Sequence, residues 1–289
     1  MSEASIRRLL VRGLAAVAAA IFVLLGYIYL TLPDIRPLRT SNPTTTAWME
    51  MRKEEARVAG RTLRHEHRWV PYSRISPQLK RAVIVAEDSA FWQHEGIDVE
   101  QIRESMEINL EQGRALRGAS TITQQLAKNL YLSPSRNPIR KLRELIIARR
   151  LEAELDKARI LEIYLNVIEW GDGVWGAEAA ARRYFGVPAS RLSGPQAALL
   201  AGAIINPRVY NPGRPNARLL RRQRIVLRRM YSVMPPSPSG TSSEPQPVDA
   251  IPTEALPQLP PSDPLVPSPE PAPCPHPPCP PEPSSKPGQ

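Results

Sequence analysis

The sequence predicts an all-α fold built around one folded domain. From Pro77 to about Met234, apolar residues recur at helical spacing, and Ala- and Leu-rich runs such as "GPQAALLAGAII" favour helix formation. Glycines and prolines divide this region into about seven helices, and no stretch shows a sustained alternation of period two. With 289 residues, 42% of them hydrophobic, the chain can bury one sizeable core.

The first predicted element is a transmembrane helix over residues 13–32. This stretch, "GLAAVAAAIFVLLGYIYLTL", contains no charged residue, and as a helix it is about 30 Å long, enough to cross the hydrocarbon core. Arg7, Arg8 and Arg12 precede it, which favours a cytoplasmic N-terminus, residues 1–12, with the bulk of the chain on the other side. A cleaved signal peptide is the alternative, but the apolar stretch is long and "YLTLPDIRP" lacks a small-x-small cleavage site. We therefore expect a single uncleaved anchor.

Two segments outside the helical region differ from it in composition. Residues 33–69 are polar and mixed, and we expect a linker that includes a short charged helix. Residues 235–289 contain 21 of the 33 prolines, and such a segment cannot repay its ordering entropy by burial, so we expect a disordered Pro-rich tail.

The tail carries six acidic residues and one lysine; since the whole chain has a formal net charge of +10, residues 1–234 carry +15. A basic domain suits nucleic acid, an anionic membrane or a phosphorylated substrate.

The two cysteines predict no structural metal site. Cys274 and Cys279 lie in the tail, within "PCPHPPC", where His276 adds a third ligand but no fourth ligand is near. We expect adventitious metal binding or a labile disulfide there.

The first candidate motif is "VIVAEDSAFWQHEGID", residues 83–98, where an apolar run ends in Glu87 and Asp88. Glu87, Phe91 and His94 stand at i, i+4 and i+7, so we expect them on one face of two helical turns. Apolar neighbours disfavour the charged form of Glu87, which raises its proton affinity toward that of a general base. A structural acid beside a hydrogen-bonded histidine is the alternative.

The second motif, "GASTITQQLAKNLYL", residues 118–132, predicts a helix with Ser120 or Thr121 as its N-cap. Thr121, Gln125 and Lys128 fall on one side of this helix, away from its apolar stripe. Amides and hydroxyls beside one lysine suit sugar hydroxyls and a phosphate. A plain amphipathic helix is the alternative.

The third motif is a basic helix within residues 140–159. Arg140 and Lys141 flank Glu144 at i−4 and i−3, so the three side chains can form a clamp for phosphate oxygens. For most of the other basic residues of this helix, a solvated face is the ordinary explanation.

Four segments, "EDSAFWQHEGID", "GASTITQQLAKN", "RKLRE" and "ARILEIYLN", occur in this order at matching spacings. Together they resemble the peptidoglycan glycosyltransferases of the lysozyme-like type, and within these the monofunctional biosynthetic transglycosylases. The resemblance covers about residues 70–232. It implies a single lysozyme-like glycosyltransferase domain over residues 70–234, and it does not extend to the tail.

The resemblance also implies roles for individual residues. Glu87 matches the catalytic base that deprotonates the 4-hydroxyl of the acceptor sugar, and Glu144 matches a second catalytic acid that orients cations or assists departure of the lipid diphosphate. Lys128 matches a position near the donor diphosphate. The substrate-binding or supporting positions are Asp88, Phe91, His94, Ser120, Thr121, Gln125, Lys128, Asn129, Arg136, Arg140 and Lys141. The segment with Glu162, Tyr164 and Asn166 matches a motif of mainly structural role.

The function that the resemblance implies is polymerisation of lipid II into β-1,4-linked glycan strands with release of undecaprenyl diphosphate. This reaction needs a base on one side of the anomeric carbon and cations on the other, which Glu87 and the group around Glu144 supply. The expected partners are lipid II, the growing lipid-linked glycan, the membrane and other cell-wall synthesis proteins. The expected location is the bacterial inner membrane, with the catalytic domain on the periplasmic side. No cofactor is required; a divalent metal, Mg²⁺ or Mn²⁺, at the diphosphate is left open.

Four other functions fit the sequence less well. A lytic transglycosylase needs one acid and no phosphate clamp, so "RKLRE" and "TITQQLAKN" argue against it. A bifunctional penicillin-binding protein needs S-x-x-K and K-T-G motifs that this sequence lacks. A non-catalytic membrane-anchored scaffold would not need Glu87 and Glu144. Nucleic-acid binding fits least, because aromatic residues do not interleave with the basic ones.

Overall fold

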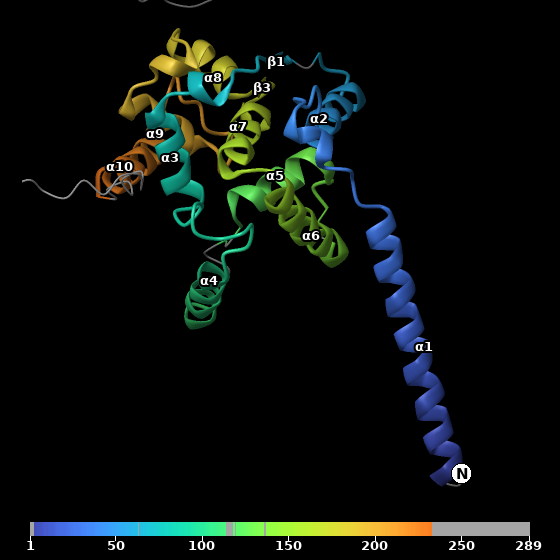
Figure 1. The fold of residues 1–289 in the computed structure, drawn as a ribbon. Coiled ribbons are helices and arrows are strands. Elements are labelled where there is room, and N and C mark those ends of the chain that lie inside the picture. The colour runs from blue at the N-terminus through green and yellow to red at the C-terminus, as the bar shows by residue number, and fades with distance from the viewer. Residues whose placement is uncertain (1–2, 63, 114–117, 119, 136, 233–289) are drawn as a thin grey trace, which may run out of the picture. The chain divides into compact units, whose positions relative to one another are not determined.

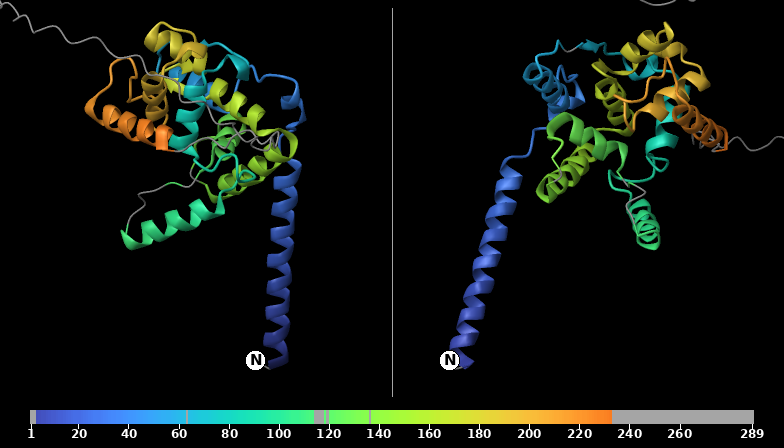
Figure 2. Two further views of the ribbon diagram at one scale, coloured as in Figure 1. Left: turned by 60° about the vertical axis from the view of Figure 1, so that its left-hand side comes forward. Right: turned by 180° about the vertical axis from the view of Figure 1, so that it is seen from behind.

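The structure is a computed structural model that describes residues 3–62, 64–113, 118, 120–135 and 137–232. It is mostly helical, which confirms the predicted fold class (Figures 1 and 2). The α-helices of the described part are α1 (Glu3–Leu30), α2 (Ala47–Val58), α3 (Pro77–Glu87), α4 (Val99–Glu111), α5 (Ile122–Tyr131), α6 (Pro138–Glu154), α7 (Lys157–Val167), α8 (Ala177–Phe185), α9 (Gly194–Ala203) and α10 (Ala217–Ser232). Short 3-10 helices span Arg36–Arg39, Tyr72–Arg74 and Ala189–Arg191.

One small sheet interrupts the helices. It contains β1 (Glu66–His67), β2 (Glu169–Gly171) and β3 (Val174–Trp175), in the order β1-β3-β2. β1 runs parallel to β3 with Glu66 opposite Val174, and β2 runs antiparallel to β3 with Glu169 opposite Trp175. The sequence did not predict these strands, because two or three residues are too few to show a period-two pattern.

Polar caps set the helix ends. The basic run at 140–159 is two helices rather than one, because Leu155 leaves the helical conformation and Asp156 begins α7, its side chain accepting from the N–H of Arg159 at 2.6 Å. Thr121, rather than Ser120, is the N-cap of α5, and it accepts from the N–H of Gln124. The break at Leu155 accounts for the difference between the predicted number of about seven helices and the eight between Pro77 and Ser232 of the described chain.

The helices form two groups that meet at the centre of the domain. One group is α3, α9 and α10, and the other is α5 and α6. α7 packs against α5 and lies between the two groups in Figure 1. The side chains of Tyr164, Trp170, Trp175 and Leu126 are fully buried in the core. The end of α3 and the start of α5 therefore lie close together. The backbone N–H of Ile122 donates to the carboxylate of Asp88, although 34 positions separate the two residues.

The segment that the sequence predicts as a linker packs onto the domain. α2 packs against α5, and Arg52 of α2 is only 3% exposed. Its guanidinium contacts Glu169 at 3.1 Å, Glu55 at 2.7 Å and also Asp172. A buried guanidinium is stable only when it is paired in this way, so these contacts fix α2 against the β2–β3 hairpin.

α1 contains the predicted membrane-spanning stretch. The apolar part, Leu10–Leu30, has 21 residues and is almost wholly exposed, which is consistent with a membrane anchor. Past its end, the carbonyl of Thr31 accepts a hydrogen bond of 2.8 Å from Arg143 of α6. The predicted tail, residues 235–289, lies outside the described residues.

Candidate active site

The candidate base lies at the end of a helix. Glu87 is the last residue of α3, and Asp88 is its C-cap. The expectation that Glu87, Phe91 and His94 share one helical face is therefore wrong, because residues 88–96 form a loop of turns. The helix stops here because Asp88 adopts an extended conformation in which its carboxylate accepts from the N–H of Ile122 at 2.9 Å.

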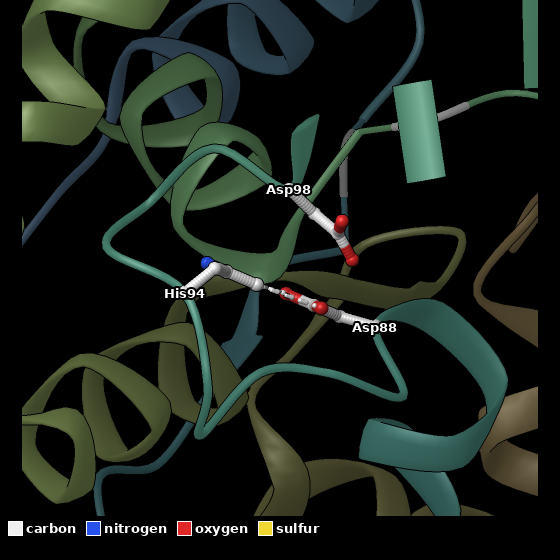
Figure 3. Close-up of side chains that lie close together, drawn as sticks. All are labelled: Asp88, His94 and Asp98. Atoms are coloured by element: carbon white, nitrogen blue, oxygen red, sulfur yellow. Dashed lines mark hydrogen bonds and ion pairs between the residues drawn. The ribbon is translucent and has the colours of Figure 1, made fainter. Parts of the chain in front are cut away.

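A hydrogen-bonded cluster holds this loop (Figure 3). The Nε2 atom of His94 lies 2.9 and 3.1 Å from the two carboxylate oxygens of Asp88. The backbone N–H of Gly96 donates to Nδ1 of His94 at 3.1 Å, so Nε2 carries the hydrogen and donates it to Asp88. Gly96 has φ +85°, and a Cβ there would lie 3.2 Å from the backbone oxygen of Ala148 in α6. The cluster thus ties the loop after α3 to α5 and α6.

Asp88, His94 and Asp98 also have the atoms of a metal site. Their ligand atoms lie within 4.8 Å of one another. However, both ring nitrogens of His94 are engaged in hydrogen bonds, and Asp98 accepts from the N–H of Gln101 at 2.8 Å as the N-cap of α4. Hydrogen bonding therefore explains the whole cluster, and a metal ion would have to break it.

Glu87 is half-buried and faces α5. The side-chain amide of Gln125 donates to Oε2 of Glu87 at 2.9 Å, and Tyr164 donates its hydroxyl to Oε1 of Gln125 at 2.8 Å. This second bond fixes which end of the amide points at Glu87. Burial raises the pKa of Glu87 above its ordinary value, and the amide of Gln125, Arg222 and Lys128 oppose the rise. A carboxylate with a raised pKa is what a general base requires.

The second acid lies on α6 and binds the two cations that the sequence placed beside it. Glu144 is 3% exposed; its oxygens lie 2.6 Å from Arg140 and 2.5 Å from Lys141. Lys141 also donates to Oε1 of Gln124 at 3.1 Å and contacts Ser120 at 3.4 Å. The three side chains are thus paired as their spacing predicts, and Lys141 joins them to α5.

Lys128 differs from these cations. Among the residues that the structure describes, its ammonium group has no hydrogen-bond or ion-pair partner; its one specific contact is with the ring of Trp48, 5.0 Å away. Burial lowers the pKa of Lys128, and the neighbouring Glu144 and Glu87 oppose that effect. An ammonium group near both acids, with free donors, can take up an anionic ligand.

A sequence model of the Transglycosylase family matches residues 55–231, which include Glu87, Lys128 and Glu144 but not Trp48. The chain belongs to the transglycosylase family. Among its relatives, the biosynthetic peptidoglycan transglycosylase of Laribacter hongkongensis is 52% identical over 229 residues, 78% of this chain and 98% of the relative. The protein of the same name from Nitrosomonas eutropha is 52% identical over 192 residues, 66% of this chain and 79% of the relative. The one from Chromobacterium violaceum is 48% identical over 226 residues, 78% of this chain and 98% of the relative.

The transglycosylase domain buries some of the predicted substrate-binding residues. Phe91 and Thr121 are fully buried, and Thr121 donates its hydroxyl to the carbonyl of Gly96 at 2.7 Å. Asn129 is 8% exposed and donates to the carbonyl of Gln125 at 2.7 Å. These three positions support the loop and α5 from inside. Arg136 lies outside the described residues.

Three residues near the site of the transglycosylase were not singled out from the sequence. Trp48 comes from the predicted linker, and Arg222 comes from α10, where it is one of several arginines. Tyr164 falls in the segment interpreted as structural, yet it orients Gln125. No local pattern marks Trp48 or Arg222; only their proximity in the folded chain does.

Proposed function

We propose that this chain polymerises lipid II into β-1,4-linked glycan, with Glu87 as the general base on the acceptor 4-hydroxyl and the cations around Lys128 at the leaving diphosphate. The observation that carries the proposal is the proximity of two groups: a half-buried Glu87 whose pKa is raised by burial, and Lys128, whose ammonium group has no hydrogen-bond or ion-pair partner among the described residues. The family and the names of the relatives support the substrate class.

The base works through one of its two carboxylate oxygens. Gln125 donates to Oε2 of Glu87, and in the described part of the chain Oε1 has no hydrogen-bond partner. We assign Oε1 to the acceptor hydroxyl proton. Tyr164 holds the amide of Gln125 in the donating orientation, so the carboxylate is positioned before the substrate arrives.

The leaving group needs positive charge on the opposite side of the anomeric carbon. Among the described residues nothing accepts from the N–H groups of Lys128, while Arg140 and Lys141 are held in place by Glu144. Glu144 acts as a positioning residue in this proposal, since both its oxygens are taken by these cations. Fixed cations stabilise charge that develops on a diphosphate without reorganising during the reaction.

The anchor fits a lipid-linked substrate. α1 would hold the domain at the leaflet where the diphosphate lies. Arginines before the apolar stretch favour a cytoplasmic N-terminus, so we place the catalytic domain on the periplasmic side of the inner membrane. The basic charge of the domain then faces anionic substrate and lipid.

No described residue requires a metal for this chemistry. Both oxygens of Glu144 already accept from Arg140 and Lys141, and Asp88 and His94 of the other candidate group are hydrogen-bonded to each other. Whether Mg²⁺ or Mn²⁺ binds at the diphosphate is left open by the sequence, and polymerisation rates with and without EDTA would decide it.

The test uses the full chain in detergent micelles with lipid II and follows glycan polymer on a gel. We expect polymer from the wild type and at least a hundredfold less from Glu87→Gln, since a general base contributes about 10²–10⁴ in rate. Glu95→Gln is the matched control: Glu95 lies in the same loop, its side chain is 78% exposed, and it pairs with Arg149 on the surface. Release of anhydro-sugar from finished wall without polymerisation would identify a lytic enzyme. Absence of both activities would favour a scaffold.

A further inference from the structure

A cavity of about 570 Å³ lies away from the residues of the candidate active site. It is formed by the end of α8, the β2–β3 hairpin, the loop before β1 and the loop between α9 and α10. Its lining includes the side chains of Arg64, Arg183, Arg208, Arg214, Tyr184 and Tyr210. None of Glu87, Lys128 and Glu144 lines it.

Close contacts with two glycines position Tyr184 and Arg64, which line the cavity. A Cβ at Gly171 would overlap the hydroxyl of Tyr184, and a Cβ at Gly173, which has φ +70°, would overlap the carbonyl of Arg64. Tyr184 and the segment before β1 at Arg64 can therefore approach the hairpin only because Gly171 and Gly173 lack side chains. Tyr184 is half-buried by this packing, so one wall of the cavity is a rigid aromatic surface.

The cavity has more positive than negative charge. Asp172 is the acid in its lining, and its carboxylate contacts Arg52 of α2. Arg64 pairs with Glu66 at 3.1 Å, and Arg208 lies 3.6 Å from Glu55. Arg183 and Arg214 have no ion-pair partner among the described residues. Two exposed guanidinium groups beside two tyrosines are suited to bind a carboxylate in a bidentate manner.

The position of the cavity favours a ligand from the wall over a membrane headgroup. The chain leaves α1 next to α6, where Arg143 contacts the carbonyl of Thr31. In Figures 1 and 2, α8 and β3 lie on the far side of the domain from α6. The sugars of peptidoglycan are N-acetylated and uncharged at their amides, so the anionic groups of this polymer that match a basic cavity are the carboxylates of its peptides.

We propose that this cavity is a second substrate-binding site, which binds the carboxylate end of a peptide attached to glycan, with Arg183 and Arg214 on the carboxylate and Tyr184 against the adjoining chain. The inference rests on the proposed function for the identity of the polymer. A volume of about 570 Å³ is within the usual range for small-ligand sites and accommodates the end of such a peptide.

The test is isothermal titration calorimetry of the full chain in detergent micelles with a soluble disaccharide-tetrapeptide that has free carboxylates. We expect saturable binding that falls at least tenfold in the double variant Arg183→Gln, Arg214→Gln, because each charge-assisted hydrogen bond lost costs about one power of ten in affinity. The matched control is Arg191→Gln, Arg218→Gln, which removes two exposed arginines outside the cavity and should change affinity less than twofold. Circular dichroism checks that both variants are folded.

Three further ligands decide the chemistry. The same compound with amidated carboxylates, the disaccharide without peptide, and inorganic phosphate should each bind at least tenfold more weakly. Equal binding of inorganic phosphate would show a general anion site and overturn the proposal, as would unchanged affinity in the Arg183/Arg214 variant. Lipid II polymerisation by the wild-type chain is measured in parallel. If the chain polymerises lipid II but does not bind the peptide, only this inference is refuted. If the wild-type chain forms no polymer, the proposed function is refuted.

Discussion

Replacement of Trp48 tests whether the segment before the domain positions the cation of the active site. The ring of Trp48 lies 5.0 Å from Nζ of Lys128, and α2 holds it there through the N-cap Thr46 and the buried Met49. Trp48→Leu keeps an apolar side chain in place but removes the aromatic face. The substitution therefore removes the cation–π contact while leaving most of the packing.

The expected effect follows from the geometry. A cation–π contact contributes about 0.5–1 kcal/mol when exposed and about 2 kcal/mol when desolvated. Lys128 is partly buried and has no other partner in the described chain, so we take about 1–1.5 kcal/mol. This equals a rise of about fivefold to thirteenfold in KM for lipid II, with a smaller change in kcat, because the ring positions Lys128 rather than reacting.

Two measurements separate this role from a general loss of structure. The first is KM and kcat for lipid II in Trp48→Leu and Trp48→Phe; the phenyl ring should restore most of the affinity. The second is the pKa of Lys128 in the two variants, by NMR of ¹³C-methylated lysines with Lys128→Arg for assignment. The charged groups that face this ammonium stay unchanged in both variants; they are Glu87 of α3 and Glu144, Arg140 and Lys141 of α6. The pKa of Lys128 should therefore be lower with Leu than with Phe at position 48. Equal KM and equal pKa in the two variants would refute the reasoning.

The remaining predictions concern the acids of the site. Glu144→Gln should lower kcat/KM for lipid II at least tenfold, about 1.4 kcal/mol, because Arg140 and Lys141 lose their shared acceptor; turnover equal to wild type would remove its positioning role. The raised pKa of Glu87 should place the acid limb of the kcat/KM profile above pH 4.5, and Glu87→Gln should abolish that limb. A group whose pKa is raised in the folded state stabilises the fold below its unfolded pKa, and this contribution is lost as pH rises through the folded pKa. Glu87→Gln should therefore raise Tm at pH 8 and not at pH 4. A lower Tm of the variant at pH 8 would contradict this sign. Asp88→Asn should destabilise the domain by about 1–3 kcal/mol, measured by urea denaturation, because one of the donors at Ile122 and His94 loses its carboxylate acceptor.

The sequence alone determined the features that depend on residues close together in the chain. The apolar stretch of α1 is set by composition. Glu144 pairs with Arg140 and Lys141 as their spacing predicts, because residues three and four positions apart on a helix are neighbours whatever the rest of the chain does. The raised pKa of Glu87 also has the predicted direction.

Tertiary structure decided what surrounds these groups. The loop after Glu87 is not helical, because Asp88 bonds to Ile122, 34 positions away, and the energy of that buried bond outweighs local helical preference. Trp48 reaches Lys128 only because the buried Arg52 fixes α2 against the hairpin that holds Glu169. Local spacing predicts side-chain pairs within one helix, whereas contacts between distant segments depend on how the buried surfaces pack, which no short stretch of the sequence specifies.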